Sequence, residues 1–120
     1  MHHNSARSQL AAALWAAMTD STATSAGTQP ADRVHPGAVA AGRRAGLDLS
    51  TATPRHLAEV NLTNRLVVTV CDRAHEDLDP GPAWLHWSIS DPVAAPSKRA
   101  FDRTVVELRD RIASLAGVAS

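Results

Sequence analysis

The sequence predicts an α/β domain built around a short parallel sheet. Strand-like apolar runs alternate with segments of helical spacing, and this alternation is typical of parallel α/β sheets. The clearest strand is the β-branched run RLVVTVCD at residues 65–72, which resembles strands that are buried on both faces. The clearest helix has apolar residues at a 4-3-4-3 spacing: Phe101, Val105, Leu108, Ile112 and Leu115. With 120 residues, the chain has the size of one domain, residues 1–120.

The first half of the chain predicts a helix, a strand and a second helix. Residues 8–18 carry Leu10, Leu14, Trp15 and Met18 at helical spacing on an alanine-rich background. Residues 22–28 (TATSAGT) follow as a short strand within a turn-rich segment.

The second predicted helix lies in HPGAVAAGRRAG. Pro36 suits its first turn and Gly46 suits its end, and His35 is interpreted as a helix-entry residue rather than a catalytic one. A short helix is then expected to begin at Thr53 or Pro54.

The second half adds two strands and the last helix. After residues 65–72, the run WLHWSIS at 84–90 is a strand candidate that Asp91-Pro92 ends. Residues 77–83 and 90–98 are expected to be loops.

Composition excludes several classes of protein. The chain has 12 basic and 12 acidic residues and a formal net charge of zero, so no charge excess indicates a nucleic-acid or membrane partner. No apolar run approaches the ~20 residues that cross a bilayer. A single cysteine, Cys71, excludes an intrachain disulfide framework and fits a reducing, cytoplasmic location.

The segment before the first helix has the composition of an anion-binding loop. Asn4, Ser5 and Ala6 precede Arg7-Ser8, where the helix begins. Backbone N–H groups of such a loop can hold an oxyanion at a helix N-terminus. The guanidinium of Arg7 can bind two oxyanion oxygens at once, and the Ser8 hydroxyl can donate to the anion or to a thiolate. The alternative is an ordinary helix start, with Ser5 or Ser8 as N-cap and Arg7 solvated.

At these residues the chain resembles the low-molecular-weight protein-tyrosine-phosphatase superfamily, particularly its arsenate-reductase branch. The signature of that family is Cys-x5-Arg-Ser, and HNSARSQLAAALW matches it from the second half of the loop onward. The similarity continues in order through SAGTQPADRVHPGAV, LDLSTATPRHL, RLVVTVCDRAHEDL and HWSISDP.

The resemblance implies a flavodoxin-like three-layer α/β/α fold with strand order 2-1-3-4. The family's first strand, which precedes the loop and is central in the sheet, is missing from this chain. We therefore expect a domain that is incomplete at the N-terminus and poorly stable alone, because neighbouring strands lose ladder partners. The resemblance also assigns an oxyanion cradle to residues His2, His3, Asn4, Ser5, Ala6 and Arg7, and catalytic roles to Arg7, Ser8 and Asp91.

Met1 occupies the position of the family's nucleophilic cysteine. A thioether does not ionise and cannot act as a thiolate nucleophile. Relatives attack arsenate or a phosphate ester with this thiolate; the chain as written is expected to bind such an oxyanion without attacking it. The alternative to an arsenate reductase or phosphatase is a non-catalytic oxyanion-binding module, or the remnant of a larger regulatory protein.

Asp91 matches the family's general acid, which protonates the leaving oxygen during phosphoryl transfer. Asp-Pro pairs are also common in turns, which is the structural alternative.

Cys71 aligns with the second cysteine of the relay in thioredoxin-coupled arsenate reductases. The third cysteine would stand at Leu78, so a reductase of this kind would need an outside thiol, such as mycothiol, or glutathione with a glutaredoxin-like redoxin. The alternative for Cys71 is a buried small apolar residue. No bound cofactor is expected. Ala12 stands where relatives with a potassium site carry an acidic residue, so no potassium site is expected here. The six histidines lack metal-ligand spacing, so no metal site is expected either.

Overall fold

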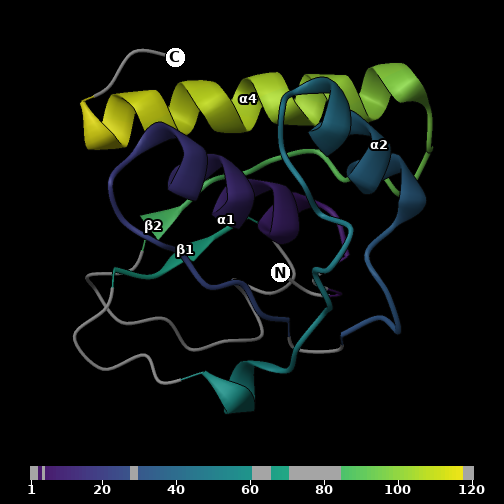
Figure 1. Ribbon diagram of the computed structural model, residues 1–120, viewed down its shortest axis with the longest axis horizontal. Helices are drawn as coiled ribbons and strands as arrows, with labels where there is room; N and C mark the ends of the chain where they lie inside the picture. The colour runs from purple at the N-terminus through teal and green to yellow at the C-terminus, as the bar shows by residue number, and fades with distance from the viewer. Residues whose placement is uncertain (1–2, 4, 28–29, 61–65, 71–84, 118–120) are drawn as a thin grey trace.

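The computed structural model describes residues 3, 5–27, 30–60, 66–70 and 85–117. Figure 1 shows its α-helices packed together on one side of two short strands, with a single 3₁₀ turn on the other side. No helix in this part of the chain is long and apolar enough to cross a membrane. The elements, in chain order, are α1 (Arg7–Met18), α2 (Pro36–Arg44), η1 (Leu57–Glu59), β1 (Val68–Thr69), β2 (Leu85–His86) and α4 (Lys98–Ala116).

The sheet is parallel, as the sequence predicts. β1 and β2 pair with Val68 opposite Leu85 and Thr69 opposite His86. The N–H of Leu85 donates to the Val67 carbonyl at 2.9 Å, and the N–H of Trp87 donates to the Thr69 carbonyl at 2.8 Å. A separate parallel bridge joins Gly27 to His56. The α/β class with a short parallel sheet is confirmed.

The strands are shorter than predicted. Of residues 22–28, Thr28 lies outside the described part; among residues 22–27 only Gly27 forms a bridge, and residues 22–26 take part in no strand pairing within the described chain. Residues 66–70 contribute two strand residues and residues 85–90 two more. Beyond Trp87 the chain passes the start of α1, where the Ile89 carbonyl accepts from Arg7. The remaining residues of both predicted strands lie outside the described part.

The helix predicted from Thr53 or Pro54 is wrong. The chain there first forms the bridge at His56 and then a single 3₁₀ turn, η1. The reason is local: the His56 ring Nδ1 accepts from the N–H of Ala58 at 3.0 Å, and the Glu59 carboxylate accepts from the N–H of His56 at 3.0 Å. The bridge keeps the backbone extended at His56, and these two bonds cap a turn that begins only after that residue.

Residues with capping side chains or special backbone conformations mark the ends of α2 and the start of α4. His35 is the N-cap of α2, as predicted, and its Nδ1 accepts from the N–H of Gly37 at 3.0 Å. Pro36 is the first residue of that helix, and Gly46 follows its end with φ +81°, a conformation that favours glycine. The Ser97 hydroxyl caps α4 by accepting from the N–H of Ala100 at 3.0 Å.

The core lies between the helices and the strands. α4 packs against both α1 and α2, so the last helix of the chain fixes the positions of the first two. Side chains with under 3% exposure come from each helix: Leu10 and Leu14 of α1, Ala38 and Ala41 of α2, and Phe101, Leu108 and Ile112 of α4. The N-terminus of α1 is therefore anchored by packing along its own length.

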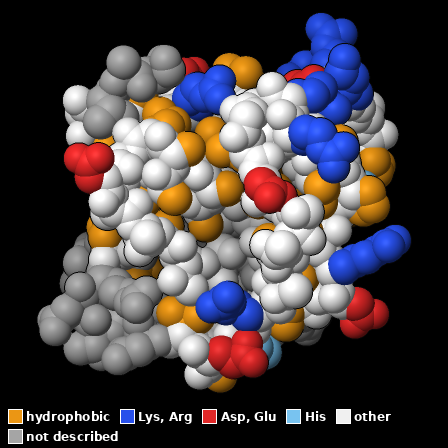
Figure 2. Space-filling model, in the orientation of Figure 1, with side chains coloured by type: hydrophobic (Ala, Val, Ile, Leu, Met, Phe, Trp, Pro, Cys, Tyr) orange, Lys and Arg blue, Asp and Glu red, His pale blue; other side chains and the backbone are white. Residues whose placement is uncertain are grey.

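One face of the molecule concentrates basic side chains. Figure 2 shows that Lys and Arg gather at the upper right of this face, over α2 and the start of α4. Arg43 and Arg44 occupy the last turn of α2. Arg44 is paired with Asp102, with Nη2 and Nε at 2.7 and 2.9 Å from Oδ1.

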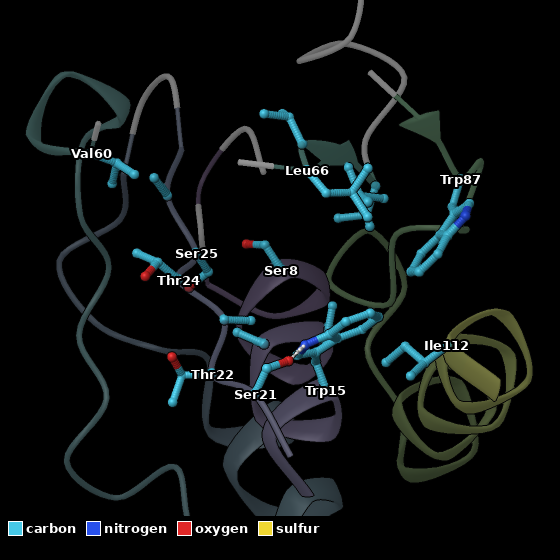
Figure 3. Close-up of a pocket in the computed structure, with 17 residues that line it drawn as sticks. Ser8, Trp15, Ser21, Thr22, Thr24, Ser25, Val60, Leu66, Trp87 and Ile112 are labelled. Carbon is cyan, nitrogen blue, oxygen red and sulfur yellow. Dashed lines mark hydrogen bonds between the residues drawn. The ribbon is translucent and has the colours of Figure 1, made fainter. Parts of the chain in front are cut away.

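Within the described residues, a cavity separates residues 22–26 from β1 (Figure 3). No strand of the described chain lies between residues 22–26 and β1, and the cavity, of about 330 Å³, is lined by both segments.

Candidate functional site

The loop before α1 is held by the neighbouring loop at residues 30–35. The Ala31 N–H donates to the His3 carbonyl at 2.8 Å, and the His35 N–H donates to the Ser5 carbonyl at 2.8 Å. These bonds turn both loop carbonyls toward the neighbouring loop. The path of the chain into α1 is consequently fixed by backbone contacts rather than by the helix alone.

The N-terminus of α1 carries no side-chain cap. Its N-cap is Ala6, which is 4% exposed, and the first turn contains no acidic residue. The alternative in which Ser5 or Ser8 caps the helix is therefore wrong: the N-cap position falls on Ala6, one residue after Ser5, and Ser8 lies buried within the first turn. The positive end of the helix dipole is not offset by a carboxylate of its own first turn, which favours an anion there.

Arg7 is bound rather than solvated. Its Nη1 donates to the Ile89 carbonyl at 2.8 Å, and its Nη2 lies 3.7 Å from Oδ2 of Asp91. The Arg7 side chain is 14% exposed and that of Asp91 is 39% exposed. The structure thus brings the first residue of α1 beside the segment that follows β2.

Asp91 has two contacts. Its Oδ1 accepts from the N–H of Val93 at 2.9 Å, across Pro92, which forms a turn. Its other oxygen faces Arg7. The turn and the position beside Arg7 are therefore compatible, because each uses a different oxygen of one carboxylate.

Two residues that the sequence analysis did not place in the site support it. Gln9 is 6% exposed and its Nε2 donates to the Thr53 carbonyl at 3.1 Å, tying the first turn of α1 to the segment before η1. The His35 ring stacks on Phe101, with centroids 5.0 Å apart and planes at 25°. His35 therefore links the loop to α4. In the sequence, the pair His35-Pro36 indicated only the start of α2 and gave no sign of the stacking on Phe101.

Several predicted site residues cannot be placed. Met1, His2, Asn4 and Cys71 lie outside the described residues, as does Leu78. His3 is exposed, and Ser5 is partly buried. Among the described residues, no three His, Cys, Asp or Glu side chains gather as a metal site would require.

The family model for low molecular weight phosphotyrosine protein phosphatase matches residues 2–119. The chain belongs to this family. The parallel α/β fold of the chain agrees with this match. No curated protein matches the chain in a sequence search.

Solved structures with this fold include reductases and phosphatases. An arsenate reductase from Archaeoglobus fulgidus is 31% identical, with a TM-score of 0.80, covering 97% of this chain and 94% of that one. An arsenate reductase in its phosphate-binding state is 25% identical, with a TM-score of 0.79, covering 98% and 94%. A protein tyrosine phosphatase, 20% identical with a TM-score of 0.81 over 97% and 89%, shares the fold.

Proposed function

We propose that this chain is an arsenate-reductase-like domain that binds arsenate or phosphate at the N-terminus of α1. The observation that carries the proposal is the position of Arg7, which lies at an uncapped helix start with its guanidinium facing Asp91. The similarity of the chain to the Archaeoglobus enzyme and to a reductase in the phosphate-binding state supports a tetrahedral oxyanion as the ligand.

Arg7 and Asp91 have complementary roles in this proposal. The planar guanidinium donates to two oxygens of the anion, while N–H groups of the loop and first turn donate to the others. Asp91, beside that guanidinium, supplies the proton that a leaving alkoxide or phenoxide takes up. Ser8, in the same turn, is proposed to donate a hydrogen bond to the anion or to a neighbouring thiolate.

In relatives the chemistry begins with a thiolate. Attack on a phosphate ester forms an S–P bond and releases the alcohol with the proton from the acid, and water then hydrolyses the phosphocysteine. Attack on arsenate forms an S–As bond and displaces one protonated arsenate oxygen as water, which gives a thiol–arsenate adduct. A second thiol then attacks the sulfur of that adduct and forms a disulfide, while As(V) leaves as arsenite, As(III). Cys71, or an external thiol such as mycothiol or a glutathione–redoxin pair, is proposed as that second thiol in a cytoplasmic setting.

Residue 1 of this sequence is methionine, at the nucleophile position that the resemblance defines. We therefore propose that the 120-residue chain binds the oxyanion without turnover. Met1 also favours the second candidate, a non-catalytic oxyanion-binding module.

Calorimetry with phosphate and arsenate tests the binding proposal. We expect saturable binding by the chain, and binding at least about tenfold weaker in Arg7→Ala because charge-assisted hydrogen bonds are lost. Arg44→Ala is the matched control, since it also removes one positive charge but leaves the site intact. No saturable binding, or equal weakening by both variants, contradicts the proposal.

A second experiment separates the two candidates. In the Met1→Cys variant, placed behind an added initiator methionine, we expect hydrolysis of an aryl phosphate that the original chain does not hydrolyse. Intact phosphate binding without any hydrolysis in Met1→Cys would favour the non-catalytic module.

A further inference from the structure

We propose that His35 is a positioning residue for the loop before α1, and that a proton on its ring weakens the binding of an oxyanion by that loop. The inference rests on the proposed function, because it concerns the regulation of the same site. Acidification then releases a tetrahedral anion that the chain holds at neutral pH.

His35 joins the loop before α1 to helix α2. Its backbone N–H donates to the Ser5 carbonyl at 2.8 Å, and its carbonyl accepts from the N–H of Ala38 at 2.9 Å. Its ring Nδ1 accepts from the N–H of Gly37 at 3.0 Å. One residue thus holds the loop with its backbone and the start of α2 with its ring, so a change at the ring is one residue away from the loop.

The cap exists only while the His35 ring is neutral. A ring nitrogen that accepts a hydrogen bond carries no proton, so the proton of the neutral ring is on Nε2. A second proton, taken from solvent, binds at Nδ1, which can then no longer accept from Gly37. The first turn of α2 contains no acidic residue, so the cation also meets the positive end of the helix dipole without a carboxylate from that turn.

Packing makes the loss of this bond a change of the whole residue. The His35 ring stacks on Phe101 with centroids 5.0 Å apart, and Phe101 is 2% exposed. A Cβ at Gly37 would come within 2.7 Å of the same Phe101 ring, so both partners of the bond lie against one buried side chain. The ring of His35 lies toward α4, whereas its N–H is directed to Ser5. The added charge therefore acts on the loop through the shift of His35 rather than by facing the anion.

Other ionisable side chains surround His35. They are His3 and Arg7 in the loop and α1, Asp32 and Arg33 in its own segment, Asp91 after β2, and Lys98 and Asp102 at the start of α4. Of these residue types, only histidine ordinarily changes its charge between about pH 5 and 8. His3 is therefore the described neighbour that an experiment must separate from His35.

The test is sulfate binding to the full chain, measured by calorimetry at about pH 8 and about pH 5.5. Sulfate is a tetrahedral oxyanion that keeps its charge over this range, whereas phosphate and arsenate titrate within it. We expect sulfate to bind at least about fivefold more weakly at the lower pH, as the loss of one hydrogen bond implies.

His35→Asn retains the cap without the titration. The side-chain oxygen of asparagine accepts the same kind of bond and takes up no proton in this range. The sulfate affinity of this variant should change by less than about twofold between the two pH values, because the cap persists. His3 is unchanged in this variant, so any pH dependence that remains belongs to other groups.

His56→Asn is the matched control. The His56 ring makes the same bond, with Nδ1 accepting from the N–H of Ala58 at 3.0 Å, but His56 is bridged to Gly27 rather than bonded to the loop before α1. Sulfate binding by this variant should depend on pH as in the original chain. Phe101→Leu removes the stacking but keeps the ring of His35, so it should also keep the pH dependence.

Nitrogen-15 NMR follows the link between ring and loop without any ligand. We expect the Nε2–H tautomer of His35 at about pH 8. As the ring titrates, the amide signals of Gly37 and of Ala6, whose peptide group includes the Ser5 carbonyl, should shift together with it. In His35→Asn this common titration should be absent.

Three results overturn the inference: an Nδ1–H tautomer at the higher pH, an Ala6 amide that does not follow the ring, or equal pH dependence of sulfate binding in His35→Asn and the original chain. Tighter sulfate binding at the lower pH also overturns it, since the charge of the ring would then outweigh the lost cap. Absence of sulfate binding at both pH values contradicts the proposed function, whereas the amide signals still decide whether His35 couples its ring to the loop.

Discussion

The guanidinium of Arg7 at the start of α1 lies 3.7 Å from the carboxylate of Asp91, just beyond β2. This contact spans most of the chain: α1 is held by its packing against α4, and β2 is held by its parallel pairing with β1. The Ile89 carbonyl fixes the second guanidinium nitrogen at 2.8 Å. Arg7 is therefore oriented before any ligand arrives, which lowers the entropic cost of binding an anion.

Arg7→Lys tests the geometry of this cation rather than its charge. Lysine keeps the positive charge but loses the planar fork that reaches the Ile89 carbonyl and the anion together. We expect phosphate affinity to fall about tenfold in calorimetry. Arg44→Lys, at the surface pair with Asp102, should leave it unchanged. Equal affinity in Arg7→Lys and the original chain would show that charge alone binds the anion.

Asp91→Asn separates the turn from the ion pair. Asparagine retains the oxygen that accepts from the N–H of Val93, but it removes the negative charge beside Arg7. We expect phosphate to bind a few-fold more tightly, because the anion no longer competes with the carboxylate. The free energy of unfolding should change by less than about 1 kcal/mol, since the pair is partly exposed. Urea unfolding and calorimetry check both results, and weaker phosphate binding would contradict the arrangement.

Gly37→Ala should destabilise the fold by about 1–3 kcal/mol through overpacking. A Cβ at this position would come within 2.7 Å of the Phe101 ring, which is 2% exposed and stacked on His35. Urea unfolding measures the effect, and Phe101→Leu in the same chain should recover part of it by clearing the ring.

Gly42→Ala is the control within the same helix. A Cβ at this position would meet Cδ1 of Leu49 at 3.3 Å. Because this atom is the end of a flexible side chain, we expect a smaller loss of stability than in Gly37→Ala. An equal loss of stability in the two variants would show that helix α2, and not the contact with Phe101, is the cause.

Ser50→Ala should raise the pKa of Asp48 toward its ordinary value. The Ser50 hydroxyl and N–H both donate to Oδ1 of Asp48, at 2.6 and 2.9 Å. They lower the pKa of this exposed carboxyl, with a smaller contribution from Arg43. The stabilisation this gives is present above the pKa of the unfolded chain and is lost as pH falls through the folded pKa.

Carbon-13 NMR of the carboxyl groups measures this titration directly. Thr51→Ala is the neighbouring control and should leave the pKa of Asp48 unchanged. An identical titration in Ser50→Ala would mean that the hydroxyl is not the main cause of the lowered pKa.

Local sequence patterns determined the helices and several of their ends. The 4-3-4-3 spacing predicts α4, Pro36 and Gly46 mark the ends of α2, and the β-branched run predicts a parallel strand at β1. These predictions succeed because helix caps, turn residues and burial patterns act over a few neighbouring residues. The same reasoning overestimated the length of the strands, since strand length depends on a partner elsewhere in the chain. It also overestimated the length of the helix after Thr53, where the chain first forms a bridge at His56.

The tertiary structure alone decided which of the predicted residues meet. The loop composition allowed either a solvated Arg7 or one turned to a site, and Asp91 allowed either a turn or a charged contact. Only the packing of α1 and α4 beside the strands sets Arg7 against Asp91 and Ile89, stacks His35 on Phe101 and opens a cavity along β1. Such contacts join distant segments, and their geometry follows from the whole core rather than from any local pattern.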